Sequence, residues 1–238
     1  MADKESLPLM RTKLHRPPVA KDHLHRQHLL DRLNRNLHRP LTLVSAPAGY
    51  GKSTLVSCWL EACDIPSAWV SLDENDNDLR MFLAYFLTAV QSIFPDTARK
   101  TQALLNSADL PPLSVLARSL INELDQIDKA FILALDDYQF IGEKAVHDIL
   151  NELLNHPPAS MHLVLTTRRD PPLPITTLRA RGQMTEIRVQ ELRFSAEETA
   201  LFLKNTLGAT VDEVTAAVLV DKTEGWITGL RLAALSLR

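Results

Sequence analysis

The stretch from Leu41 to Thr54 carries residues that could hold a chain of phosphates. It reads LTLVSAPAGYGKST, an apolar run followed by small residues and then Lys-Ser-Thr. Backbone N–H groups can approach a phosphate only where no Cβ stands in the way, and Gly49 and Gly51 meet that need. Lys52 would place its ammonium near the β- and γ-phosphates, and Ser53 would offer its hydroxyl to Mg²⁺.

The loop departs from the pattern G-x-x-x-x-G-K-[ST] at one position, where Ala46 replaces the first glycine. A methyl group is the smallest possible intrusion, so we expect little change. The loop follows a predicted strand and precedes a predicted helix from Ser53 to Ala62, whose positive dipole end would face the anion. We predict that the phosphates are bound by Ala48, Gly49, Tyr50, Gly51, Lys52, Ser53 and Thr54.

A second group of chemical residues lies in Ala130 to Tyr138, AFILALDDY, an apolar strand that ends in two carboxylates. A strand this apolar must be covered on both faces, as in a parallel sheet. At its carboxyl end Asp136 can hold Mg²⁺ through a water, while Asp137 polarises an attacking water. By itself the pair is also compatible with a simple Asp-Asp turn. The phosphate loop some eighty residues earlier favours the catalytic interpretation.

Arg168 follows a further apolar strand, Met161 to Thr167. At that strand end an arginine can contact the γ-phosphate and distinguish a triphosphate from a diphosphate, whereas Arg169 should point away into solvent. The sequence thus predicts Lys52, Asp137 and Arg168 as catalytic residues, and Ser53 and Asp136 as metal ligands.

These residues need a regular scaffold, and hydrophobic periodicity predicts one. Besides those already named, strands are expected at Ser67 to Leu72 and Met184 to Val189. Helices are expected at about His25–Leu37, Leu79–Phe94, Leu113–Ile127 and Glu143–Leu154, with a short helix at ITTLRARG and a polar linker at Pro95–Pro112.

After about residue 190 the pattern is purely helical. Ser195 and Glu198 form a capping box, Gly208 should end that helix, and Val211–Thr223 and Thr228–Leu237 supply two more. The expected parts are an amino-terminal arm and helix over the ligand (1–40), an α/β core (41–190) and a helical lid (191–238).

Composition limits the classes of function. The chain has 238 residues, 45% of them hydrophobic, which suffices for a true core. Residues 1–40 hold nine Lys/Arg against four Asp/Glu, a net of +5, which leaves −8 for the remainder. An acidic domain is a poor candidate for binding nucleic acid through a broad basic face. Only two cysteines, no signal peptide and no membrane span indicate a soluble, cytoplasmic protein.

Two metal sites are weighed and disfavoured. His23, His25 and His28 lack a cysteine or a closely spaced carboxylate to complete a zinc site. The acidic turn at Asp73 to Asp78, DENDND, lacks the glycine and the terminal glutamate of a calcium loop, so we expect a solvated turn.

Together these pieces resemble the amino-terminal ATPase module of the MalT-like regulators. These are large ATP-dependent, LuxR-type transcriptional activators among the signal-transduction ATPases with numerous domains (STAND). The resemblance rests on TKLHRPPV, SAPAGYGKSTL, WVSLDENDND, LALDDYQFI, TTRRDPPLP, LRARGQMTEIR and EGWITGLRLAALSLR, which cover nearly the whole chain in order. One departure is Arg231, which stands where the wider class has proline.

The resemblance implies an α/β P-loop NTPase with a five-stranded parallel sheet of order 5-1-4-3-2 and a small helical lid. It implies ADP or ATP with Mg²⁺, and an adenine contact for which Arg26 in the arm is the best polar candidate. It implies a switch: ADP marks a resting form, an inducer sensed by downstream helical repeats permits exchange for ATP and self-association, and a further domain binds DNA. The chain is then expected to be a domain-sized fragment.

Three functions fit a phosphate loop. The leading hypothesis is a switch of slow turnover. A small-molecule kinase is the alternative, with Arg179 and Arg181 as a phosphate clamp, although adjacent Asp136 and Asp137 suit the activation of water better than that of a bound acceptor. A nucleic-acid motor is disfavoured by the acidic charge balance and by the absence of an aromatic-studded basic groove.

Overall fold

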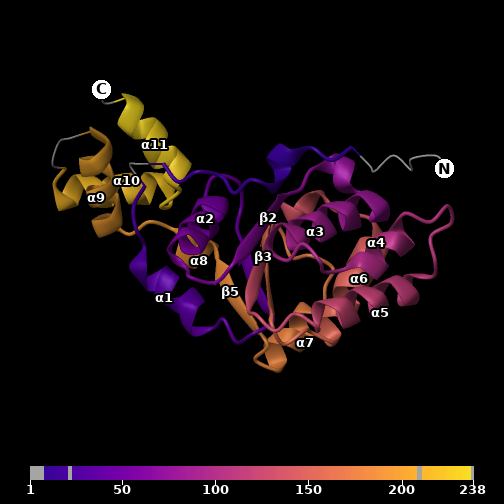
Figure 1. Cartoon of the computed structure of the whole chain (residues 1–238). Helices are drawn as coiled ribbons and strands as arrows, with labels where there is room; N and C mark the ends of the chain where they lie inside the picture. Colours follow the sequence, from indigo (N-terminus) through magenta and orange to yellow (C-terminus); the bar gives the residue numbers. More distant parts are fainter. Residues whose placement is uncertain (1–7, 21–22, 208–210, 237–238) are drawn as a thin grey trace.

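A five-stranded parallel sheet forms the centre of the molecule in a computed structural model, which describes residues 8–20, 23–207 and 211–236 (Figure 1). Across the sheet the order is β2-β3-β4-β1-β5 and every neighbouring pair is parallel. The strands are β1 (Leu41–Ser45), β2 (Ser67–Ser71), β3 (Phe131–Asp136), β4 (Met161–Thr167) and β5 (Met184–Arg188). The predicted parallel sheet and its strand order are confirmed.

Helices cover both faces of this sheet, and every residue of the central strands β1, β3 and β4 is buried. One face packs against α3 to α6 and the other against α1 and α2. The helices are α1 (Gln27–Arg35), α2 (Lys52–Ala62), α3 (Leu79–Ile93), α4 (Arg99–Leu105), α5 (Leu113–Leu124), α6 (Lys144–Asn155), α7 (Ile175–Ala180), α8 (Val189–Leu192), α9 (Ala196–Leu207), α10 (Glu213–Thr223) and α11 (Ile227–Ser236). Short 3-10 turns are η1 (Arg11–Leu14), η2 (Glu74–Asp76) and η3 (Tyr138–Phe140).

Helix α4 corrects the prediction of a polar linker at Pro95–Pro112. Glu123 of α5 accepts hydrogen bonds from the first turn of α4, at 2.9 Å from the Lys100 N–H and 2.8 Å from the Thr101 N–H. These bonds satisfy donors that a helix start leaves open, and Leu105 is buried at the far end of the helix. The cap comes from a separate helix, so the local sequence gave no sign of it.

The acidic turn is also different from expectation, because it is not simply solvated. Asp76 is fully buried, and Lys13 of the arm binds Asp73 and Asp76 at 2.8 Å each. Burial lowers the pKa of Lys13, but hydrogen bonds to both aspartates outweigh that effect and raise it. The turn therefore anchors the arm across β2 and α3.

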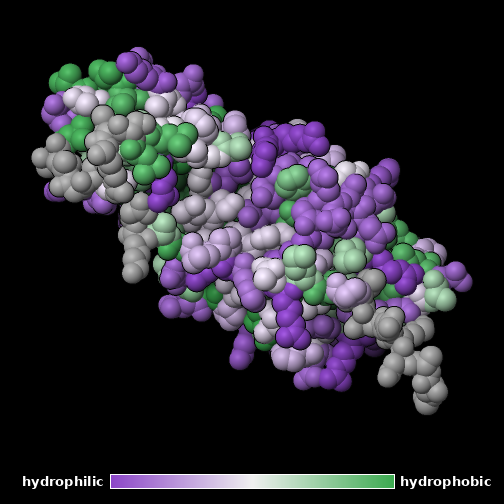
Figure 2. All heavy atoms as spheres, turned by 90° about the horizontal axis from the view of Figure 1, so that it is seen from above, coloured by the Kyte–Doolittle hydropathy of each residue, from purple (hydrophilic) through white to green (hydrophobic). Residues whose placement is uncertain are grey.

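The carboxy-terminal part from residue 191 onward is called the lid below. Its helices α9 to α11 pack around a small core of their own at one end of the molecule (Figure 1). The predicted capping box is present, since Ser195 and Glu198 exchange hydrogen bonds of 3.0 and 3.1 Å. The predicted helix end at Gly208 lies outside the described residues. Hydrophobic side chains gather on the outside of the lid (Figure 2), among them Leu201, Val214, Val218, Leu232 and Leu235.

Through the described ranges, no helix combines the length and the apolar character that crossing a membrane would take.

Candidate functional site

The loop between β1 and α2 has the backbone conformation that its glycines predict. Gly49 has φ +79° and Gly51 has φ +76°, in the left-handed region that favours glycine. Ala46 has no positive φ and is 3% exposed, packed in the core beside Val44 and Leu55. The missing first glycine is therefore accommodated, because neither backbone strain nor crowding opposes a methyl group there.

Lys52 opens α2 and lies under this loop. Its side chain is buried, and Nζ donates a hydrogen bond to the Pro47 carbonyl oxygen at 3.1 Å. Burial lowers the pKa of Lys52, while the charge of Asp137 opposes the shift. A buried ammonium with a single carbonyl contact gains most from an anion, which would both pair with its charge and restore its pKa.

Ser53 and Asp136, the predicted metal ligands, are brought together at the carboxyl edge of the sheet. Ser53 Oγ donates to Asp136 Oδ1 at 2.8 Å, and the Thr166 hydroxyl donates to the same oxygen. The pKa of Asp136 is raised, because burial outweighs the opposite effect of these two hydrogen bonds. A hydroxyl beside a carboxylate suits Mg²⁺, which usually keeps water and substrate phosphates among its ligands.

No group of three or more His, Cys, Asp or Glu side chains that could hold a metal occurs within the described parts of the chain. The His23 and His25 rings instead pack edge to face, with centroids 4.2 Å apart. A cation at Ser53 and Asp136 would therefore depend on phosphate oxygens for the rest of its shell.

Asp137 and Arg168 follow β3 and β4 on the same edge of the sheet. The charge of Asp137 raises the pKa of Lys52, and the charge of Arg168 lowers it. Asp137 has φ +58°, which is uncommon for a residue with a side chain. Gln139 Nε2 donates to Asp137 Oδ1 at 2.7 Å, and the Arg168 N–H donates to Gln139 Oε1 at 3.1 Å. Arg168 and Arg169 are both exposed.

Thr166 and Gln139 also belong to this site, although the sequence did not predict them. The strand register supplies the signal for Thr166, since Leu135 pairs with Leu165 and so Asp136 lies next to Thr166. That register is known only once β3 and β4 are known to be neighbours. Nothing in the sequence marked Gln139 as a site residue except its position shortly after the two aspartates.

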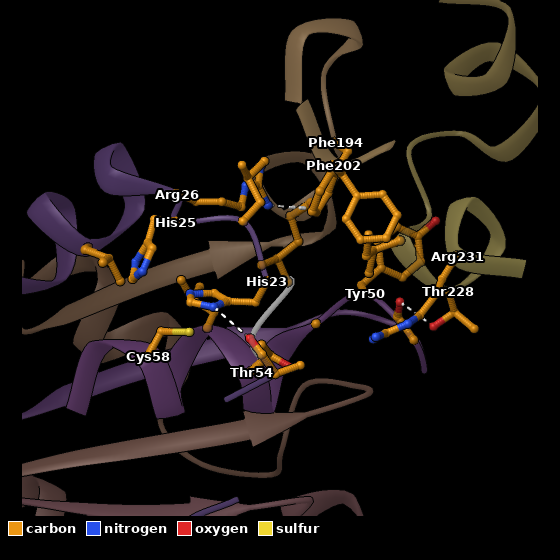
Figure 3. Close-up of a pocket in the computed structure, with 18 of the residues that line it drawn as sticks. His23, His25, Arg26, Tyr50, Thr54, Cys58, Phe194, Phe202, Thr228 and Arg231 are labelled. Atoms are coloured by element: carbon orange, nitrogen blue, oxygen red, sulfur yellow. Dashed lines mark hydrogen bonds between the residues drawn. The ribbon is translucent and has the colours of Figure 1, made fainter. Parts of the chain in front are cut away.

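A cavity of about 260 Å³ lies beside the loop (Figure 3). Its walls come from the arm, the loop, α2 and the lid. Most of the lining is apolar, and burial raises the pKa of Cys58 in its wall to about 11, so that thiol stays neutral. A largely apolar cavity next to a phosphate loop suits the base and sugar of a nucleotide. Its lining includes Ala20, His23, Arg26, Tyr50, Thr54, Cys58, Phe194, Phe202, Thr228 and Arg231.

Arg26 lines this cavity, but its guanidinium holds the arm to the lid. Nε donates to Glu198 Oε1 at 2.9 Å, and the two Nη atoms donate to the carbonyl oxygens of residues 191, 192 and 193. The guanidinium also lies 5.0 Å from the centre of the Phe194 ring. The contact of Arg26 with a base stays a prediction, and in this structure the residue acts as a clamp.

The lid binds the phosphate loop directly. Trp226 Nε1 donates to the Ala48 carbonyl oxygen at 3.0 Å, and Thr228 Oγ1 donates to the Gly49 carbonyl oxygen at 3.0 Å. Both contacts use loop carbonyl groups, so they do not compete for the N–H groups that a phosphate would use. Arg231 lies one turn after Thr228 and lines the cavity from the same helix.

Replacement of Gly49 by alanine should release the lid. A Cβ there would lie 2.5 Å from Trp226 Nε1 and 2.6 Å from Thr228 Oγ1. We expect Gly49→Ala to lower the free energy of unfolding by about 1–2 kcal/mol for the left-handed backbone and by about 1–3 kcal/mol more for the overlap, as urea unfolding would measure. Gly182→Ala is the matched control, because Gly182 has φ +65° and open space around its Cβ position. Equal losses in the two variants would contradict the lid contact.

Known proteins similar to this chain include the HTH-type transcriptional regulator MalT of several Yersinia species. The chain is 36% identical over 231 residues to MalT of Yersinia pestis and 35% identical over 230 residues to MalT of Yersinia enterocolitica. Each match covers 97% of this chain and 25% of the relative. The chain thus spans about a quarter of the length of these relatives. No family model matches the chain.

Two solved structures of similar fold are described as ATPases. A STAND protein with a tetratricopeptide repeat sensor from Pyrococcus horikoshii aligns with a TM-score of 0.61 and 15% identity, over 91% of this chain and 30% of that one. A Walker-type ATPase of Pyrococcus abyssi aligns with a TM-score of 0.59 and 18% identity, over 93% and 69% of the two chains. At such identities the likeness shows the fold alone, which is that of a P-loop NTPase.

Proposed function

We propose that this chain, a homologue of MalT regulators over nearly its whole length, is an ATP- and ADP-binding switch module. The observation that carries the proposal is the convergence of five predicted residues on one sheet edge. Beside them is a cavity partly lined by the lid, which touches the loop. The five residues are Lys52, Ser53, Asp136, Asp137 and Arg168.

In this proposal the loop and Lys52 hold the phosphates. Ser53 and Asp136 would hold Mg²⁺, which would offset phosphate charge. Asp137 takes a proton from water while the water oxygen bonds to the γ-phosphorus. The bond from that phosphorus to the β–γ bridging oxygen breaks, and its electron pair leaves on ADP. Arg168 contacts the γ-phosphate and so distinguishes ATP from ADP.

Turnover is slow in this proposal because fast hydrolysis requires an arginine that a second copy of the chain inserts into the site. Such arginine fingers contribute about 10³ to 10⁵ in rate. We further propose that ATP favours self-association, that longer chains of this kind add a helical-repeat sensor and a DNA-binding domain, and that the protein works in the cytoplasm. The proposed parts are the arm (1–40), the core (41–190) and the lid (191–238).

The kinase alternative loses its expected clamp. Arg179 binds Glu186 of β5 at 2.6 Å. Helix α7 leads into the amino end of β5, so Arg179 and Arg181 lie toward the sheet edge opposite Lys52. Cations at that edge cannot hold the phosphates of a ligand bound at the loop.

The nucleotide that stays with the purified protein tests the switch. A resting switch retains ADP because the cavity, the clamp at Arg26 and the lid enclose it. Denaturation followed by ion-exchange chromatography should therefore release ADP in an amount equal to the protein. Protein reloaded with a non-hydrolysable ATP analogue should sediment as a larger species than the ADP form. Absence of bound nucleotide, together with sedimentation that is the same in both states, would contradict the switch.

A further inference from the structure

The Gln139 side chain joins the carboxyl ends of two neighbouring strands. Its amide nitrogen donates to Asp137 Oδ1 at 2.7 Å, and its amide oxygen accepts from the Arg168 N–H at 3.1 Å. Gln139 lies in η3, directly after β3, whereas Arg168 directly follows β4. One amide group therefore fixes the distance between the end of β4 and the carboxylate of Asp137.

Asp137 is held from a second side as well. Its backbone N–H donates to Thr166 Oγ1 at 3.0 Å, and Thr166 also belongs to β4. The left-handed conformation of Asp137 is unfavourable for a residue with a Cβ, so these contacts must hold it in place. Strained residues held by their surroundings are common where orientation matters for function.

The Gln139 bond separates the roles of the two Asp137 oxygens. Oδ1 accepts from Gln139, while no described group donates to Oδ2 in the hydrogen bonds of this structure. An amide has both a donor and an acceptor on one rigid plane, so Gln139 can hold Asp137 and Arg168 together. A leucine of similar size can make neither hydrogen bond. A glutamate could still accept from the Arg168 N–H, but it has no donor for Asp137 Oδ1.

We propose that Gln139 is a positioning residue for ATP hydrolysis: it fixes Oδ1 of Asp137 so that Oδ2 faces the attacking water. The inference rests on the proposed function, in which Asp137 accepts the water proton. It adds that the orientation of Asp137 depends on the Arg168 backbone at the end of β4. The residue that contacts the γ-phosphate and the residue that activates water then move as one unit.

The test compares Gln139→Leu and Gln139→Glu with the unaltered protein. Single-turnover cleavage of ATP by excess protein should slow about tenfold in both variants, because one orienting bond is lost. Dissociation constants for ATP and ADP should stay within about twofold, because Gln139 contacts neither the loop nor the cavity. Gln190→Leu, at an exposed glutamine of α8, is the matched control and should leave both quantities unchanged.

A double variant separates positioning from mere folding. If Gln139 acts through Asp137, adding Gln139→Leu to Asp137→Asn should cause no further slowing. Unaltered cleavage by Gln139→Leu while Asp137→Asn is inactive would overturn the inference and leave the proposed function intact. A further tenfold loss of the ATP cleavage rate in the double variant, relative to Asp137→Asn alone, would also overturn the inference. Cleavage that proceeds normally in Asp137→Asn, or is absent from the unaltered protein, would overturn the proposed function and this inference with it.

Discussion

Lys52→Ala should abolish the stabilisation of this protein by nucleotide. A ligand that binds only the folded state stabilises it by about 2.7 kcal/mol at a hundredfold excess over its dissociation constant. In a chain of this size each kcal/mol raises the melting temperature by about 2–4 °C. Lys52 is a buried cation beneath the loop, so its loss would remove the charge that the proposed function pairs with the phosphates. Melting curves with and without ADP measure the effect.

The matched control for Lys52 is Lys129→Ala, at an exposed lysine outside the site. It should be stabilised by ADP as much as the unaltered protein. If ADP stabilised Lys52→Ala as much as the unaltered protein, Lys52 would not contribute to nucleotide binding. No stabilisation of the unaltered protein by ADP, ATP or GTP would overturn the proposal that it binds nucleotide.

Asp137→Asn should stop hydrolysis and leave ATP binding intact. A positioned general base contributes about 10² to 10⁴ in rate, and an amide cannot take the proton. Binding should persist because the proposed function assigns the phosphates to the loop and Lys52, and the metal to Ser53 and Asp136. The Asp137 backbone bond to Thr166 is also independent of its side chain. Phosphate release measures the rate, and titration with a fluorescent ATP analogue measures binding.

Asp128→Asn controls for the loss of one carboxylate, since Asp128 is exposed and precedes β3 rather than following it. Its rate and affinity should match those of the unaltered protein. If Asp137→Asn lost binding and hydrolysis together, Asp137 would have a structural role at the strand end instead of a catalytic one.

Much of the site could be predicted because its residues follow local rules. Glycine is favoured where a loop backbone must approach an anion closely. Gly49 and Gly51 meet that requirement, and each has a positive φ. Asp136 ends an apolar run whose burial on both faces predicts a parallel sheet. In such a sheet the carboxyl ends of all strands lie on one edge, so strand-end residues meet without any contact having to be known in advance.

The strands, the loop, the parallel sheet and the residues at its carboxyl edge could therefore be predicted from local sequence patterns. The contacts between side chains far apart in the chain became known from the folded structure. Arg26 reaches Glu198 and clamps the lid, Glu123 caps α4, Lys13 neutralises Asp76, and Trp226 reaches the loop. This difference arises because periodicity and backbone conformation are local properties. A hydrogen bond or an ion pair between distant residues exists only once packing has brought its two partners together.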